Sequence, residues 1–267
     1  MGREPRFLGT PIVNAAYPRQ FPLAARQALY DVIHARRDVR RDFLPDPIPA
    51  EVLHRILDAA HHAGSVGFMQ PWNFLVLTDR ERRERIHRIF CRENERAAAR
   101  FTGARAELYR SLKLEGMLEA GANLCVTCDR ERHGPEVLGR NTMRDTDLYS
   151  TCCAIQNLWL TARAEGLGVG WVSILDPEEV KRELGIPESH ALVAYLCLGY
   201  VRAFADKPDL ERAGWLERVP LSRVTFSETW GTPLEASAVS APVEPGAQAT
   251  GQEMNCEITA GGPVPHG

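Results

Sequence analysis

Several features that define other protein classes are missing from this sequence. No apolar run reaches the roughly 18 residues that a membrane-spanning helix needs. The opening stretch, "MGREPRFLGTPIVN", lacks the apolar core of a signal peptide. Neither a P-loop nor a His-Glu-x-x-His zinc motif occurs, and the histidines have no ligand spacing. We therefore expect no membrane association and no metal site.

The chain also lacks a strong charge imbalance and a disulfide framework. Its 267 residues carry a formal net charge of −3, which gives no general reason to expect nucleic acid binding. The seven cysteines are an odd number, scattered through a chain long enough to fold without disulfides. This pattern is typical of a reducing compartment, and we predict a cytoplasmic location.

Apolar residues at regular spacings predict helices that alternate with strands. Helices are expected from about 23 into the arginine-rich stretch 36–41, and over about 52–63, 80–90, 146–165 and 177–184. Strands are expected over 72–79, 122–128, 168–175 and 191–201. This alternation predicts a central sheet covered by helices on both faces. The nearly all-apolar run 191–201 should be a central strand.

Motifs that carry chemistry in other proteins have simpler explanations here. The CxxC pair Cys125 and Cys128 lies in an apolar run without the second pair that a zinc site needs, so we interpret it as packing. Cys152 is expected on the inner face of its helix, and we assign neither Cys152 nor its neighbour Cys153 a chemical role. The glycines of "GLGVGW" (166–171) precede a strand, the reverse of a dinucleotide-binding loop. A helix end and a tight strand entry explain them.

The unusual stretch is "ARRDVRRDF" (35–43), in which arginines surround Asp38. Because the preceding helix is expected to run into this stretch, one turn brings Arg36 or Arg37 next to Arg40, and Arg37 next to Arg41, where like charges repel. A bound phosphate would relieve that repulsion, because arginine holds phosphate through a planar fork. The alternative is a set of surface salt bridges with neighbouring aspartates. A second stretch, "GSVGFMQPWNF" (64–74), could present backbone N–H groups and Gln70 to a flat polar ligand, or could simply connect a helix to a strand.

Together these stretches resemble the FMN-dependent nitroreductase superfamily. The shared pattern is "ARRDVR" after a helix, "S….QPW" before a strand, and "GLGVGW" after a later helix. The chain departs from the usual motifs with Asp38 in place of serine, Phe68 in place of asparagine and Ser173 in place of a frequent glycine. Those departures, with "LYRSLKLEG", "VTCDR" and "GWVSILDPEE", closely resemble the BluB family of 5,6-dimethylbenzimidazole synthases. The likeness spans about 23–230.

The resemblance implies an α+β fold, in which a mixed β-sheet is flanked by helices on both faces, and a homodimer with flavin at the interface. It implies that reduced FMN and O2 react to give 5,6-dimethylbenzimidazole, the lower ligand of cobalamin, and erythrose 4-phosphate. A separate NAD(P)H-dependent flavin reductase would supply the reduced FMN. Two alternatives are a conventional NAD(P)H-dependent nitroreductase or dehalogenase, and an FMN carrier without catalysis.

Carried over residue by residue, the resemblance implies that Asp38 and Ser173 are catalytic. The implied FMN-binding residues are Arg36, Arg37, Asp38, Val39, Arg40, Ser65, Met69, Gln70 and Ser173. The arginines would hold the phosphate and ribityl chain, and the loop residues would line the ring. We expect the arginines to lower the pKa of Asp38, so that a carboxylate stands ready to take a proton. A weakly anchored segment, 91–115, would close over the flavin.

Four parts are predicted along the chain. They are an N-terminal arm (1–22), a nitroreductase-like flavin domain (23–206), a C-terminal dimer arm (207–230) and a disordered tail (231–267) that is rich in Pro, Gly, Ala and Ser. Residues 207–230 carry apolar side chains without a clear period. They are interpreted as an arm on a partner subunit, the alternative being an excursion over the chain's own core.

Overall fold

The computed structural model describes residues 20–234, so most of the predicted N-terminal arm and C-terminal tail lie outside the described residues. The helices are α1 (Leu23–Ala35), α2 (Ala50–His61), α3 (Arg80–Ala98), α4 (Gly103–Ser111), α5 (Thr146–Ala164), α6 (Pro177–Leu184) and α7 (Asp209–Arg212), with 3₁₀ turns η1 (Val66–Phe68) and η2 (Leu221–Arg223). The strands are β1 (Trp72–Leu77), β2 (Ala122–Asp129), β3 (Leu167–Val172) and β4 (His190–Tyr200).

The four strands form one sheet in the order β1-β2-β4-β3. The apolar run of β4 lies between β2 and β3, as predicted. The α+β architecture is confirmed, but the named strands pair antiparallel throughout. Parallel pairing in the described part of the chain is confined to a single bridge between Asp38 and Val169. A mixed sheet has both parallel and antiparallel pairs, and the parallel pair here comes from the arginine-rich segment after α1.

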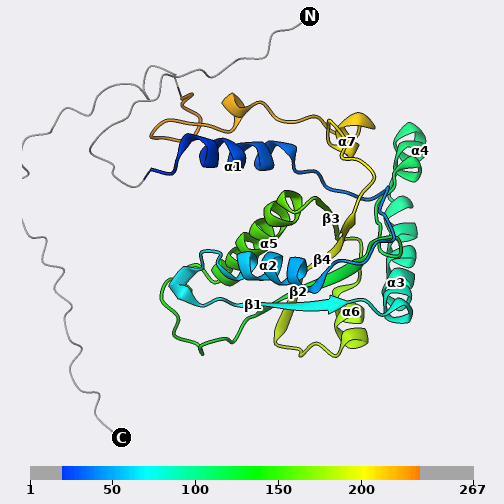
Figure 1. The fold of residues 1–267 in the computed structure, drawn as a ribbon, viewed down its shortest axis with the longest axis horizontal. Helices are drawn as coiled ribbons and strands as arrows, with labels where there is room; N and C mark the ends of the chain where they lie inside the picture. The colour runs from blue at the N-terminus through cyan, green and yellow to red at the C-terminus, as the bar shows by residue number, and fades with distance from the viewer. Residues whose placement is uncertain (1–19, 235–267) are drawn as a thin grey trace, which may run out of the picture. The chain divides into compact units, whose positions relative to one another are not determined.

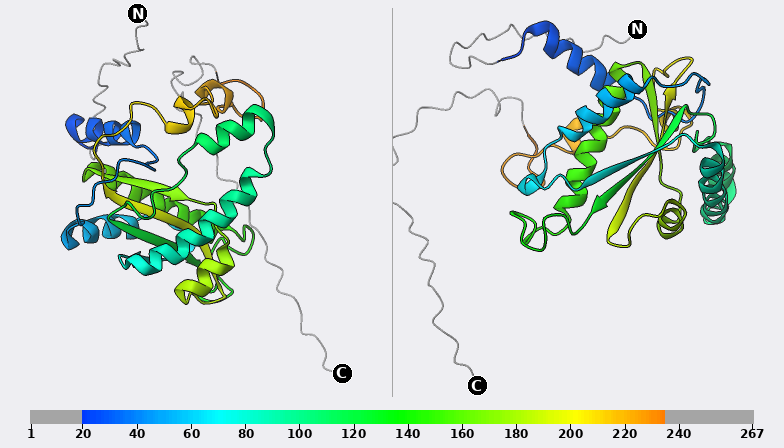
Figure 2. Two further views of the ribbon diagram at one scale, coloured as in Figure 1. Left: turned by 90° about the vertical axis from the view of Figure 1, so that its right-hand side faces the viewer. Right: turned by 60° about the horizontal axis from the view of Figure 1, so that its bottom comes forward.

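Helices cover both faces of the sheet (Figures 1 and 2). Alternate residues of a strand point to opposite faces, and apolar side chains on each face pack against helices. On β2, Leu124 and Val126 pack in one core with apolar residues of α2 and α5. The intervening Cys125 packs in a second core with residues of α3 and α6. Two buried layers therefore hold the sheet rigidly between helices.

Local sequence signals set several helix ends. Asp176 accepts a hydrogen bond from the backbone N–H of Glu179 at the start of α6, and Gly185 ends that helix at φ +66°. Both features of α6 were predicted from the sequence. On α5 the prediction for Cys152 is wrong, because Cys152 and Cys153 are exposed. The buried face of α5 instead includes Ala154, a small side chain that lets the helix pack closely.

The segment from α3 to α4 is anchored more firmly than its polar sequence predicts. The Tyr109 hydroxyl donates to Asn94 Oδ1 at 2.8 Å. Trp215 packs against Phe101 and Tyr109, with ring centroids 5.4 and 6.1 Å away. An aromatic residue about a hundred positions later therefore supplies the contact that the local sequence does not reveal.

The chain divides into two compact units after Leu216. The predicted dimer arm straddles this division. Its first part, with α7, belongs to the larger unit. In the second unit, Phe226 pairs with Pro233 in a short bridge and packs on Trp230, with ring centroids 4.7 Å apart.

Candidate functional site

The arginine-rich segment is extended rather than helical. Helix α1 ends at Ala35, and Arg36 already has extended dihedral angles of φ −62° and ψ 134°. The prediction that one helix turn pairs the arginines is therefore wrong. The segment instead lies along β3, where the Val39 N–H donates to Val169 O at 2.9 Å. Extended backbone sends alternate side chains to opposite sides, so Asp38 and Arg40 share one side.

Two glycines of "GLGVGW" make this docking possible. A Cβ atom on Gly170 would lie 2.0 Å from Val39 O, and one on Gly168 would lie 3.0 Å from Val39 Cγ2. The interpretation as a helix end holds for Gly166, at φ +81°. Gly168 and Gly170 serve a different purpose, because Gly170 leaves room for the backbone of the arginine-rich segment and Gly168 leaves room for the Val39 side chain.

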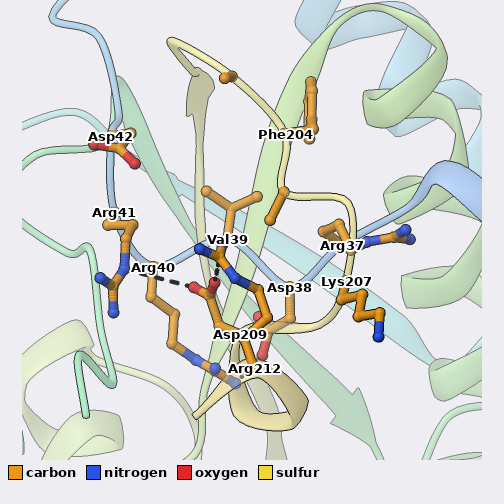
Figure 3. Close-up of a pocket in the computed structure, with 12 residues that line it drawn as sticks. Arg37, Asp38, Val39, Arg40, Arg41, Asp42, Phe204, Lys207, Asp209 and Arg212 are labelled. Atoms are coloured by element: carbon orange, nitrogen blue, oxygen red, sulfur yellow. Dashed lines mark hydrogen bonds and ion pairs between the residues drawn. The ribbon is translucent and has the colours of Figure 1, made fainter. Parts of the chain in front are cut away.

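The docked segment forms one wall of a charged cavity of about 150 Å³ (Figure 3). Its lining comprises Arg37, Asp38, Val39, Arg40, Arg41, Asp42, Ala203, Phe204, Ala205, Lys207, Asp209 and Arg212. Five of these side chains are cationic and three are anionic, a formal excess of two positive charges. The cavity is therefore suited to a doubly charged anion of small size.

The three arginines that were predicted to bind phosphate have different surroundings. Arg40 pairs with Asp38 inside the cavity. The Nη atoms of Arg37 donate to the carbonyl oxygens of His34 and Asp206 at 2.6 and 2.5 Å. Its Nε is buried and has no acceptor among the described residues. Arg36 is absent from the cavity lining, and its guanidinium lies 4.9 Å from the ring centroid of Trp159.

Asp38 is held from two sides. Arg40 pairs with one carboxylate oxygen, and the Trp171 N–H donates to the other at 3.0 Å. Burial raises the pKa of Asp38 above its ordinary value of 3.8, although Arg40, the Trp171 N–H and Arg36 each act to lower it. The prediction of a lowered pKa is therefore wrong, because loss of water around the carboxylate outweighs the arginine charges.

The loop before β1 contains the second group of predicted site residues. The Ser65 hydroxyl accepts a hydrogen bond from the Gln70 N–H at 3.2 Å, and Met69 is fully buried. Gly67, Phe68 and Gln70 all have positive φ angles, of 59°, 53° and 45°. For the two residues that are not glycine, such a conformation costs about 1–3 kcal/mol each and is concentrated at functional sites.

The two groups of predicted residues lie at opposite ends of the sheet. Trp72 follows the loop and pairs with Cys128 on β2. Val169, the residue bridged to Asp38, pairs with Leu198 on β4, which in turn pairs with Ala122 on β2. Six residues of β2 separate these levels, or roughly 20 Å at about 3.3 Å per residue. In Figures 1 and 2 the turn that precedes β1 and the segment that follows α1 lie toward opposite ends of the sheet.

Ser173 occupies an intermediate position. It is exposed and follows β3 directly, four residues beyond Val169, where Asp38 is bridged. That spacing is roughly 13 Å along the strand. The Asp38 carboxylate itself reaches the Trp171 N–H, two residues before Ser173, so the two predicted catalytic residues could contact neighbouring parts of one ligand that lies along β3.

Three charged lining residues were missed from the sequence. Lys207, Asp209 and Arg212 were assigned to a dimer arm, but they line the cavity beside the arginine-rich segment (Figure 3). Asp209 lies 3.6 Å from Arg41 and 3.7 Å from Arg212. The charges of "KPDLER" are evident in the sequence, but nothing near them in the sequence indicates that they contact the arginine-rich segment, about 170 residues earlier.

The cysteine pair that was interpreted as packing is indeed buried in β2. Burial raises the pKa of Cys125 to about 12 and that of Cys128 to about 11, so neither is a ready thiolate. Within residues 20–234, no three His, Cys, Asp or Glu side chains gather closely enough to hold a metal ion. None of the described helices combines the length and apolar character needed to cross a bilayer.

Comparison with known proteins identifies the family. The nitroreductase family model matches residues 33–200. The 5,6-dimethylbenzimidazole synthases of Rhodospirillum rubrum and Rhodobacter capsulatus are 46% and 40% identical to the chain, each over 75% of it and over 94% and 96% of their own lengths. The structure of oxidised iodotyrosine deiodinase bound to FMN and 3-iodo-L-tyrosine superimposes with a TM-score of 0.59 at 25% identity, covering 74% of this chain and all of that one. The resemblance is confirmed, and the chain belongs to the nitroreductase family.

Proposed function

We propose that this protein is a 5,6-dimethylbenzimidazole synthase, which converts reduced FMN and O2 into 5,6-dimethylbenzimidazole and erythrose 4-phosphate. The observation that carries the proposal is the position of Asp38. A carboxylate, where ordinary family members carry serine, is fixed by Arg40 and the Trp171 N–H at the wall of a cationic cavity. The similarity to two named synthases over nearly their whole length supports the same activity.

The charged cavity fits the phosphate of FMN. Its excess of two positive charges matches a phosphate dianion, and the buried Arg37 Nε is a donor in need of an acceptor. We propose that Arg40, Lys207 and Arg212 contact the phosphate from the cavity wall, joined by Arg37 and Arg36. Because the Nη atoms of Arg37 are engaged with carbonyl groups, Arg37 also fixes the shape of the segment.

In this proposal Asp38 accepts a proton from the ribityl end of the substrate. Its raised pKa makes it a stronger base than an ordinary aspartate, provided that the working pH keeps it ionised. The Trp171 N–H leaves the carboxylate oriented but not neutralised. Reduced FMN would supply the ring atoms and electrons, and O2 would be the oxidant.

Ser173 is proposed to hold the flavin ring by a hydrogen bond from its hydroxyl. The residue is exposed at the end of β3, on the strand that carries the docked arginine-rich segment. A substrate anchored by its phosphate near Asp38 and extended along β3 would bring its ring toward Ser173. The hydroxyl would then act where charge develops on the ring system.

The distribution of the site supports a homodimer with the flavin at the subunit interface. The Ser65–Gln70 loop is roughly 20 Å along the strands from the phosphate cavity. Helix α1 has no buried residue and exposes Leu29 and Tyr30, each 54% accessible. Exposed apolar side chains grouped on one helix are typical of an interface. We propose that a second copy covers α1 and supplies its own Ser65–Gln70 loop to the ring.

A composite site predicts complementation between two inactive variants. Asp38→Asn removes the proposed base, and Gly67→Ala disrupts the loop, because its Cβ would lie 2.5 Å from Leu138 O. In a mixed dimer one of the two sites would regain both intact elements, so activity should partly return. Mixed dimers without activity would show that each site is built from one chain.

A separate flavin reductase is proposed as the source of reduced FMN. The glycine-rich "GLGVGW" forms β3, and two of its glycines accommodate Val39, so it does not form a dinucleotide-binding loop. A conventional NAD(P)H-dependent nitroreductase or dehalogenase is the second candidate, favoured by the fold shared with iodotyrosine deiodinase. An FMN carrier without catalysis is the third.

Incubation with chemically reduced FMN in air distinguishes these functions. A synthase forms 5,6-dimethylbenzimidazole, which mass spectrometry detects directly. A conventional reductase returns intact oxidised FMN and consumes NAD(P)H with a nitroaromatic or halogenated acceptor. A carrier binds FMN, forms no benzimidazole and consumes no NAD(P)H. Absence of the benzimidazole with fully reduced substrate would refute the proposal.

A further inference from the structure

Arg132 connects the loop between β2 and α5 to the backbone of the Ser65–Gln70 loop. Its Nη1 donates to the carbonyl oxygens of Gln70 and Trp72 at 2.6 and 3.2 Å. Its Nη2 donates to Asn73 Oδ1 at 2.5 Å. Charged donors form the stronger class of protein hydrogen bonds. One guanidinium therefore engages both the last residue of the loop and the beginning of β1.

The guanidinium is itself held in place. Arg132 Nε lies 3.5 Å from Asp129 Oδ2, and the side chain is only 29% exposed. The Asp129 N–H donates to Pro71 O at 2.7 Å. Three successive carbonyl groups are therefore bound. Arg132 binds those of residues 70 and 72, and the backbone of Asp129, whose side chain faces Arg132, binds that of residue 71.

The loop needs such support because its backbone is strained. Phe68 and Gln70 have left-handed dihedral angles, and Gln70 precedes a proline, which restricts it further. Phe68 is 79% exposed and contributes little packing. A loop of this kind keeps one shape only when its surroundings over-determine it, and the Arg132 fork supplies the charged contact to its final carbonyl.

We propose that Arg132 is a positioning residue, which holds the Ser65–Gln70 loop in the strained shape that receives the flavin ring. It acts through the backbone of Gln70 and does not touch the flavin itself. That the loop lines the ring rests on the proposed function. Lysine, a point charge without the planar fork, should replace Arg132 only in part.

The test compares Arg132→Gln and Arg132→Lys with Arg144→Gln, which removes an exposed arginine from the same connecting segment. The first measurement is hydrogen exchange of the 66–70 amides in flavin-free protein. Because hydrogen bonds to charged groups contribute the equivalent of about a tenfold change or more, exchange of the Gln70 amide should accelerate about tenfold in Arg132→Gln. The dissociation constant for FMN should rise by a similar factor, with Arg132→Lys intermediate and Arg144→Gln unchanged.

Two results would overturn the inference. One is unchanged exchange and FMN affinity in Arg132→Gln, even if its melting temperature falls. The other is equal losses in Arg132→Gln and Arg144→Gln. Neither measurement requires turnover, so a wild-type protein that makes no dimethylbenzimidazole would refute the proposed function and leave this inference standing.

Discussion

Gly170→Ala tests whether the docking of the arginine-rich segment on β3 matters for catalysis. The added Cβ would lie 2.0 Å from Val39 O, whereas real Cβ contacts essentially never fall below 3.0 Å. The backbone at Val39 must therefore retreat by at least about 1 Å from its present position. Asp38 is the preceding residue, so its carboxylate moves with the segment.

The magnitudes favour loss of function over loss of folding. Forcing the methyl group into place costs about 1–3 kcal/mol. Releasing the segment breaks the hydrogen bonds Val39 N–H to Val169 O and Trp171 N–H to Asp38, worth about 1 kcal/mol each. Alanine in a strand recovers about 0.5–1 kcal/mol relative to glycine. A net loss of about 1–2 kcal/mol leaves most domains folded, whereas a 1 Å misplacement of a reacting group can reduce the rate about 100-fold.

The assay pairs product formation with thermal unfolding. Gly170→Ala should lower the melting temperature by a few degrees, since each kcal/mol corresponds to about 2–4 °C in a domain of this size. Its dimethylbenzimidazole formation should fall about 100-fold. Gly64→Ala is the matched control, because no atom lies within 4 Å of its added Cβ and its φ is not positive. A Gly170→Ala protein with normal product formation would refute the reasoning.

Three further predictions concern the cavity. FMN should bind at least about tenfold more tightly than riboflavin, because each charge-assisted phosphate contact contributes about 1.5–3 kcal/mol; equal affinities in a fluorescence titration would contradict the phosphate site. Asp38→Asn should bind FMN at least as tightly as the wild type while product formation falls about 10²–10⁴-fold, and a normal rate would end the catalytic role of Asp38. The folded protein binds a proton at Asp38 more readily than the unfolded chain, because the pKa of Asp38 is raised above 3.8. The free energy of unfolding should therefore fall as pH rises from about 4 through the folded-state pKa, and melting curves of Asp38→Asn should lack this part of the decrease.

The elements of the fold were accessible from the sequence where local chemistry decides them. The cap at Asp176, the left-handed Gly185 and the apolar run of β4 each predicted an element that the structure contains. The arginine-rich segment was assigned to a helix because its preference was judged alone. What makes it extended is a tertiary partner, β3, whose glycines at 168 and 170 admit it.

In the candidate site, too, the sequence reveals features set by local residues and misses those set by tertiary contacts. The arginines and the Ser65–Gln70 loop were identified from unusual composition and from a family resemblance. Lys207 and Arg212 were missed because their link to Arg41 and Asp38 exists only in three dimensions. The direction of the pKa shift at Asp38 was misjudged for a related reason. The sequence displays neighbouring charges, but it does not display how far water is excluded from the carboxylate.

The most direct test of the central claim is a mass balance with isotopically labelled substrate. Reduced FMN carrying ¹³C in its dimethyl-substituted ring is mixed with the protein in air, and labelled products are quantified against the FMN that disappears. The proposed function predicts that the label is recovered in 5,6-dimethylbenzimidazole, with one erythrose 4-phosphate for each molecule formed. Recovery of all the label in intact oxidised FMN would contradict it.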